Sequence, residues 1–217
     1  MSIYKAVIFD FGGVFTSSPV EKFTAYEVAN KLPKNFLGNV IKQNHHTNAW
    51  AKFERSEISR QQFDRDFAAE TLEQGHQIKG NTLLSLLTLE LKPEMIKAHQ
   101  RIRASGLKTG CITNNIPNMD SAKMLNSPQS GKLANEILTS FDSVIESSKA
   151  GVRKPEPSIY QMMCGQLNVD PSVCIFLDDL GINLKPARAL GMTTIKVPLY
   201  DVNPAIQELY ALLDLMD

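Results

Sequence analysis

The sequence has no long apolar run and no excess of charge of either sign. None of its hydrophobic stretches approaches the ~20 residues that a transmembrane helix needs, and its start lacks the pattern of a cleaved signal peptide. Its 23 basic residues balance 23 acidic ones, so no overall positive field attracts nucleic acid or acidic membranes. We therefore expect a cytoplasmic protein with neither nucleic acid nor membrane as a partner.

Cysteine is also scarce, which excludes a disulfide framework. The three cysteines are Cys111, Cys164 and Cys174, an odd number without the spacing of a metal site. Two of them, Cys111 and Cys174, lie inside apolar runs, where a buried free thiol is the favoured interpretation.

What the chain does contain is typical of a globular protein. Of its 217 residues, 43% are hydrophobic and 21% are charged, which excludes wholesale disorder. This length favours roughly one to one and a half domains.

Short apolar runs bounded by turn residues indicate the fold class. They span residues 4–9, 108–112, 143–145, 173–177 and 193–197. Because they are continuous rather than alternating, they are typical of strands that are buried on both faces, as in a parallel sheet. Segments of helical period separate the later runs, at 93–106, 157–167 and 183–190. This alternation predicts an α/β protein with a doubly wound parallel sheet.

One stretch, residues 18–89, carries only helical signals. Ser18 with Pro19 is typical of a helix start, and Ser59 with Gln62 of a capping box. The stretch is too long for a crossover connection between two strands. We predict an α/β core built from residues 1–16 and 90–217, with a helical subdomain inserted at 17–89.

Polar side chains follow three of the predicted strands where each strand ends. Asp10 follows the first strand, Thr113 and Asn114 follow the second, and Asp178 and Asp179 follow the fourth. Ligands of open α/β sheets bind outside the carboxyl ends of the strands. The sequence therefore predicts one site along this edge.

Each of these residues has an ordinary alternative role. Asp10 before two glycines fits a turn, and Thr113 fits a helix cap. Lys154 follows in the loop beyond the third predicted strand, and an isolated lysine is usually solvated. The pair Asp178 and Asp179 is harder to explain, because adjacent carboxylates that leave a buried strand repel each other unless a cation lies nearby. Mg²⁺ suits such an acidic, oxygen-rich place. Taken together, the residues favour a functional site.

Four ordered motifs resemble those of the haloacid dehalogenase superfamily. They are Asp10–Val14, Thr113–Asn114, Lys154–Tyr160 and Phe176–Asn183. Within the superfamily, residues 53–59 and 177–192 are similar to the N-terminal phosphatase-like domains of soluble epoxide hydrolase and of certain acyl-CoA dehydrogenase family members. The resemblance implies a Rossmann-like core with an inserted α-helical cap.

The resemblance also implies roles for the acidic residues. Asp10 would be the nucleophile that attacks the phosphorus of a small phosphorylated metabolite and forms an acyl-phosphate. Mg²⁺ would be held by Asp10, the carbonyl of Gly12 and Asp179, while Asp178 would orient a metal-bound water.

Three further residues would act on the phosphate. Thr113 and the backbone amide of Asn114 would bind its oxygens, and Lys154 would offset the negative charge. For Arg153, which lies beside Lys154, a role other than substrate contact is the favoured interpretation.

One position departs from the family pattern. Phosphatases of this superfamily usually carry a second aspartate two residues after the nucleophile, where this chain has Gly12. That aspartate protonates the leaving alcohol, an effect worth typically about 10²–10⁴-fold. We therefore expect weakened activity on alkyl phosphates and less loss on aryl or acyl phosphates.

Two alternatives stay open: a carbon–halogen or carbon–phosphorus hydrolase, and a non-catalytic phosphate-binding or regulatory protein. The carboxylates expected to hold a metal argue against carbon–halogen hydrolysis, because the departure of a halide needs neither a metal nor a proton.

Overall fold

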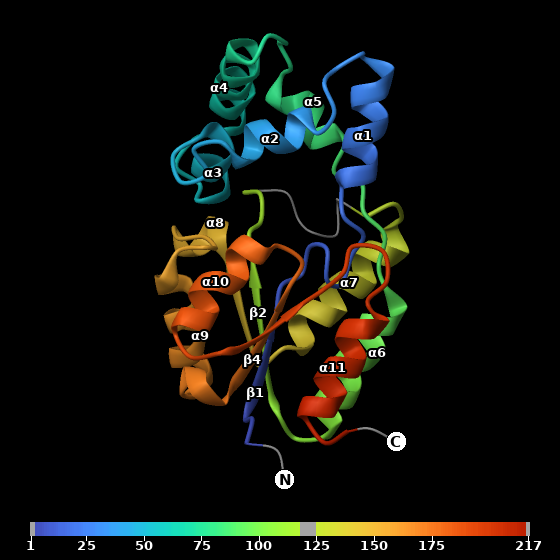
Figure 1. Ribbon diagram of the computed structural model, residues 1–217, viewed down its shortest axis with the longest axis vertical. Helices are drawn as coiled ribbons and strands as arrows, with labels where there is room; N and C mark the ends of the chain where they lie inside the picture. The colour runs from blue at the N-terminus through green and yellow to red at the C-terminus, as the bar shows by residue number, and fades with distance from the viewer. Residues whose placement is uncertain (1–2, 118–124, 216–217) are drawn as a thin grey trace.

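A five-stranded parallel sheet forms the centre of the lower part of the molecule (Figure 1). The computed structural model describes residues 3–117 and 125–215, so the two chain ends and residues 118–124 lie outside it. The strands are β1 (Ala6–Phe9), β2 (Lys108–Thr113), β3 (Ser143–Glu146), β4 (Cys174–Asp178) and β5 (Thr193–Lys196). Their order is β3-β2-β1-β4-β5, and every neighbouring pair is parallel. The predicted fold class is confirmed.

Helices cover both faces of this sheet, which explains why β1 and β4 are buried along their whole length (Figure 1). On one face, Val7 and Phe9 pack with α6 (Pro93–Ala104), α7 (Pro128–Ser140) and α11 (Asn203–Leu212). On the other, Ala6 and Ile8 pack with α9 (Pro157–Leu167) and α10 (Gly181–Ala189). Two short elements, α8 (Ser147–Ala150) and the 3₁₀ turn η2 (Pro171–Val173), lie in the connections. All four residues of β1 are fully buried, so β1 is the central strand of the core.

Residues 17–89, which we call the helical insert, form a second layer beyond the carboxyl ends of the strands (Figure 1). The insert contains α1 (Val20–Ala29), α2 (Phe36–Lys42), α3 (Ala49–Glu54), α4 (Arg60–Glu73) and α5 (Gly80–Ser85). Its apolar cluster is centred on Phe53, Phe63 and Phe67 and also includes Ile116 of the core. As expected, the Ser59 hydroxyl caps α4 by accepting a hydrogen bond from the Gln62 amide at 3.1 Å.

The two connections between insert and sheet lie side by side. Thr16 forms a bridge with Leu91, and the Ser17 amide donates to the Glu90 carbonyl at 2.7 Å. In residues 3–117 and 125–215, no helix has both the length and the apolar character needed to cross a bilayer.

His99 on α6 is a buried polar side chain in the apolar core. Its ring stacks on the Phe141 ring, with 4.1 Å between the ring centroids. It lies nearly perpendicular to the rings of Phe9 and Phe15, with 5.8 Å between the centroids in each pair. Its Nε2 is buried without a hydrogen-bond partner among the described residues. Burial, with a smaller contribution from Arg103, lowers the pKa of His99 to about 4, although Asp142 opposes the shift. The neutral imidazole is therefore the form that the fold accepts.

This histidine makes the stability of the fold depend on pH. The pKa is lower in the folded state than the usual 6.5, so the unfolded chain binds a proton first, and stability present above pH 6.5 is lost as the pH falls toward 4. Between about pH 7.5 and about pH 5, we expect the free energy of unfolding to fall by about 2 kcal/mol more than in His99→Phe. Urea titrations of both proteins at several pH values measure this. Equal pH dependence in both would contradict the expectation.

Candidate active site

The centre of the site is Asp10, the residue that follows β1. Its amide donates to the Leu177 carbonyl at 2.8 Å, which fixes the main chain beside β4. One carboxylate oxygen, Oδ1, accepts from the Phe11 amide at 2.6 Å and lies 2.8 Å from Lys154 Nζ. Both contacts involve the same oxygen, so they orient the carboxylate and leave Oδ2 without a hydrogen bond to the described residues.

Asp10 shares its surroundings with the two adjacent aspartates after β4. Asp10, Asp178 and Asp179 are all buried, and they offer carboxylate oxygens that lie within 4.8 Å of one another. Burial raises the pKa of Asp10 well above its usual range; Lys154 opposes this shift, and the other two aspartates add to it. Burial, followed by the charge of Asp178, raises the pKa of Asp179 to about 6. The cluster therefore concentrates negative charge that a cation would stabilise.

The donor set fits Mg²⁺, which prefers carboxylate and carbonyl oxygens. The loop after Asp10 leaves room beside Asp179 because position 13 is glycine. Gly13 has φ +77°, and a Cβ atom there would lie 2.3 Å from Asp179 Oδ2. A side chain at position 13 would displace the carboxylate. Gly12, whose carbonyl is a predicted ligand, lies in the same loop.

Lys154 is the buried cation that faces this cluster. Its Nζ lies 2.8 Å from Asp10 Oδ1 and 2.8 Å from Asp178 Oδ2, and the residue is only 1% exposed. Burial alone lowers the pKa of Lys154, but Asp10 and Asp178 outweigh it, and the net shift is upward. The side chain of Asn114 holds the lysine's main chain: its Oδ1 accepts from the Lys154 amide at 2.9 Å, and its Nδ2 donates to the Lys154 carbonyl at 3.0 Å.

Asp178 is held by residues to which the sequence assigned no role. Its Oδ1 accepts from the Leu180 amide at 2.7 Å, and Asn183 Nδ2 lies 3.0 Å from each of its oxygens. The Tyr160 hydroxyl in turn donates to the Asn183 carbonyl at 2.7 Å. Tyr160 and Asn183 both lie inside the motifs that carry the family resemblance. Their position there was the signal that could have identified them.

The remaining predicted residues lie beside Asp10 on the same edge. Thr113 ends β2, which is the neighbour of β1, and it is buried. Its hydroxyl makes no hydrogen bond to the described residues. Since the Asn114 side chain is occupied by Lys154, only the main chain of Asn114 is available to a ligand there.

A parallel sheet with a buried acidic cluster and a buried lysine at the carboxyl ends of its strands is typical of enzymes with a Rossmann-like fold. The chain belongs to the family of haloacid dehalogenase-like hydrolases, whose model matches residues 4–191. The predicted superfamily is thereby confirmed.

Individual proteins agree with this assignment. The chain is 37% identical over 215 residues to mouse acyl-CoA dehydrogenase family member 10, covering 97% of this chain and 19% of that protein. It is 31% identical over 216 residues to pig bifunctional epoxide hydrolase 2, covering 94% of this chain and 38% of that protein. The chain therefore spans less than half the length of these two relatives.

A solved structure shows the same fold. It is a haloacid dehalogenase family enzyme from Bacteroides thetaiotaomicron in complex with magnesium and inorganic phosphate. Its TM-score is 0.60 at 17% identity, and the match covers 91% of this chain and 96% of that one.

Proposed function

We propose that this hydrolase is a Mg²⁺-dependent phosphatase that acts through Asp10 on a small phosphorylated molecule. The observation that carries the proposal is the orientation of the Asp10 carboxylate, with Oδ1 bound to Lys154 and Oδ2 available. An anionic nucleophile can approach an anionic phosphate only where positive charge offsets the repulsion, and Lys154 supplies it. The magnesium and phosphate of the Bacteroides enzyme support the same chemistry.

The reaction takes two displacements at phosphorus. A carboxylate oxygen of Asp10 attacks the phosphorus, and the bond to the leaving oxygen breaks, which gives an acyl-phosphate on Asp10 and a free oxyanion. Water then attacks the same phosphorus, the bond to Asp10 breaks, and inorganic phosphate leaves as the carboxylate is restored. The Thr113 hydroxyl and the Asn114 amide donate to the phosphate oxygens in both steps.

The residues that would hold Mg²⁺ are Asp10, Asp179 and the Gly12 carbonyl. When bound, the ion offsets the negative charge of the phosphate and of the carboxylate cluster. Asp178 is less available for direct contact, because its oxygens accept from Lys154, Asn183 and the Leu180 amide. This supports the predicted role of Asp178 in orienting water rather than holding the metal itself.

Gly12 decides which substrates the enzyme accepts. A glycine cannot protonate a leaving group, so the oxyanion has to leave unassisted. Aryl and acyl phosphates release stable anions and need little assistance, whereas alkyl phosphates release strongly basic alkoxides. The proposed substrates are therefore phosphates with good leaving groups. The helical insert acts as the cap that excludes water and selects among them.

A leaving-group series tests the proposal. We expect para-nitrophenyl phosphate to be hydrolysed at least about 10²-fold faster than an alkyl phosphate, because general acid assistance of that size is missing. Activity is expected to disappear with a chelator and return with Mg²⁺. Equal rates for both esters, or hydrolysis that survives chelation, would contradict the proposal. No turnover of either ester with phosphate still bound would favour a non-catalytic phosphate-binding protein.

A further inference from the structure

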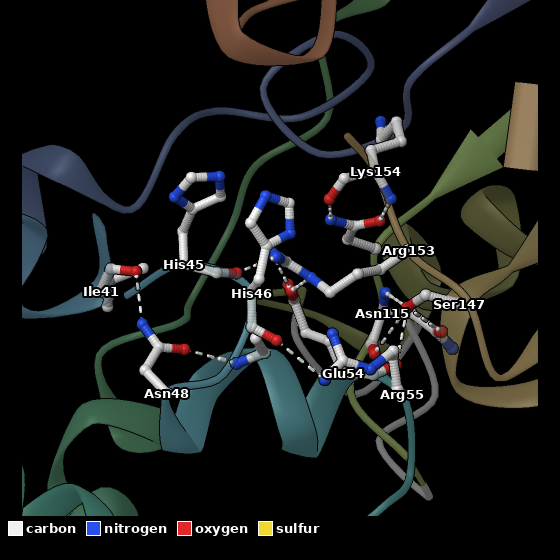
Figure 2. A network of polar contacts seen from close by, with 12 residues as sticks. Ile41, His45, His46, Asn48, Glu54, Arg55, Asn115, Ser147, Arg153 and Lys154 are labelled. Carbon is white, nitrogen blue, oxygen red and sulfur yellow. Dashed lines mark hydrogen bonds and ion pairs between the residues drawn. The ribbon is translucent and has the colours of Figure 1, made fainter. Parts of the chain in front are cut away.

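A buried ion pair joins the helical insert to the core beside the active site (Figure 2). Glu54, at the end of α3, is 4% exposed, and Arg153, in the loop before α9, is 8% exposed. Glu54 Oε2 accepts from Arg153 Nε at 2.6 Å and lies 2.6 Å from Arg153 Nη2. The same guanidinium donates through Nη1 to the His45 carbonyl at 2.7 Å. One core arginine is therefore bound to two separate points of the insert.

The main chain of Glu54 is also bound to the core. Its carbonyl accepts from the Ser147 hydroxyl at 2.8 Å, and the same hydroxyl accepts from the Asn115 amide at 3.0 Å (Figure 2). Asn115 follows directly after Asn114, whose side chain holds the main chain of Lys154. Glu54 therefore contacts Arg153 directly through its side chain, and its carbonyl is linked to Asn115 through the Ser147 hydroxyl.

The place of Arg153 in the chain gives the ion pair its significance. Arg153 directly precedes Lys154, and the two side chains leave the chain in different directions (Figure 2). Arg153 reaches the insert, while Lys154 Nζ reaches Asp10 at 2.8 Å. A contact that restrains Arg153 therefore also restrains the main chain of Lys154, the residue whose side chain contacts Asp10.

The energetics argue against a purely stabilising role. A buried ion pair gains little over well-packed apolar residues, because both charges lose their hydration. Burial raises the pKa of Glu54, while Arg153 opposes the shift. Such a pair stabilises one arrangement specifically, since the charges are matched only when the insert lies against the core.

We propose that Glu54 is a positioning residue: by binding Arg153 it fixes the main chain of Lys154 when the helical insert lies against the core. Glu54 does not touch the reacting atoms, and its side chain acts through Arg153. The effect on turnover rests on the proposed phosphatase function, whereas the effect on the Lys154 main chain does not.

The test compares Glu54→Gln with Glu57→Gln. Glu57 lies three residues further on, its side chain is 47% exposed, and it pairs with Arg55, whose side chain is 11% exposed. Both variants remove one negative charge from the same segment. With para-nitrophenyl phosphate, we expect Glu54→Gln to lower kcat at least about tenfold with little change in KM, because positioning affects the transition state rather than ground-state binding. Glu57→Gln is expected to keep the kcat of the original protein.

A double-mutant cycle tests whether Glu54 acts on Lys154 through Arg153. Because Glu54 acts through Arg153, Arg153→Gln is expected to lower kcat as much as Glu54→Gln, and the double variant no further. Additive losses would overturn the proposed route.

Hydrogen exchange decides the proposal without relying on turnover. The Lys154 amide is bonded to Asn114 Oδ1, so its exchange reports how firmly this main chain is held. We expect Glu54→Gln to accelerate its exchange at least about tenfold by NMR, and Glu57→Gln to leave it unchanged. An unchanged rate in Glu54→Gln would overturn the proposal, whatever happens to kcat. If the original protein hydrolysed no phosphate ester, the proposed function would fail, and the exchange rates would still decide the role of Glu54.

Discussion

Asp10→Asn is expected to lower the turnover of para-nitrophenyl phosphate by at least about 10⁴-fold, the scale on which enzymes lose activity with their nucleophile. An asparagine amide cannot form the acyl-phosphate. Its Oδ1 can still accept from the Phe11 amide and from Lys154 Nζ, the two contacts that orient the carboxylate. The variant therefore removes the nucleophilic carboxylate and keeps the two contacts that orient the side chain at position 10.

The fold is expected to survive this change. Lys154 keeps its second acceptor, Asp178 Oδ2 at 2.8 Å, and the amide removes one of three mutually repelling charges from the cluster. Thermal unfolding is expected to stay within a few degrees of the original protein. Inorganic phosphate is expected to bind at least as tightly by calorimetry, because a repelling negative charge is gone.

A matched control is available at the other end of β4. Asp170 is exposed, and its Oδ1 accepts from the amide and the hydroxyl of Ser172, again two donors on one oxygen. Asp170→Asn makes the same chemical change away from the site and is expected to leave turnover unchanged. Residual turnover in Asp10→Asn well above the expected loss would show that another group is the nucleophile.

The parts of the fold that were predictable are those determined by local sequence. The five apolar runs match five strands, and the predicted helix at 157–167 has the bounds of α9. The start of α10 was predicted at Asn183, whereas the helix begins at Gly181, because glycine is a poor helix former and gives no start signal.

Two core helices, α7 and α11, were not predicted. The buried face of α7 is formed by Gly131, Ala134 and Ile137, two of which are too small to give a hydrophobic period. A signal did exist for α11, in a proline at its second position and the spacing of Ile206 and Leu209.

The residues of the site likewise include some that local sequence predicts and some that it does not. Asp10, Asp178 and Asp179 were predictable as neighbours because strand ends meet at one edge of a parallel sheet. The pairing of Glu54 with Arg153 was not, because the two residues are 99 positions apart. Their contact depends on how the insert lies on the sheet, and no local pattern encodes that.

Gly12 is the position where a single substitution is expected to add activity. A Cβ atom at Gly12 would have nothing within 4 Å, and its φ lies outside the left-handed range. The first side-chain atom of an aspartate therefore fits there without displacing a neighbour. The adjacent Gly13 is the opposite case, because a Cβ there would collide with Asp179.

We expect Gly12→Asp to raise kcat/KM for an alkyl phosphate by about 10²-fold or more, the usual contribution of a general acid. The new carboxyl would lie close to Asp10, and the nearby negative charges are expected to raise its pKa, which favours the protonated form that donates to the leaving oxygen. Para-nitrophenyl phosphate needs no such proton, so its rate is expected to change much less. The ratio of the two rates is therefore the decisive measurement.

Gly12→Asn separates proton transfer from the effects of size and polarity. Asparagine has the same shape as aspartate but no acidic proton, so it is expected to leave the alkyl phosphate rate near that of the original protein. An equal gain in both variants would show that filling the space, rather than donating a proton, accelerates the reaction. No gain in a folded Gly12→Asp protein that still binds Mg²⁺ would mean that the acid is not what the site lacks. A gain confined to the aspartate would identify Gly12 as the position that limits this hydrolase to good leaving groups.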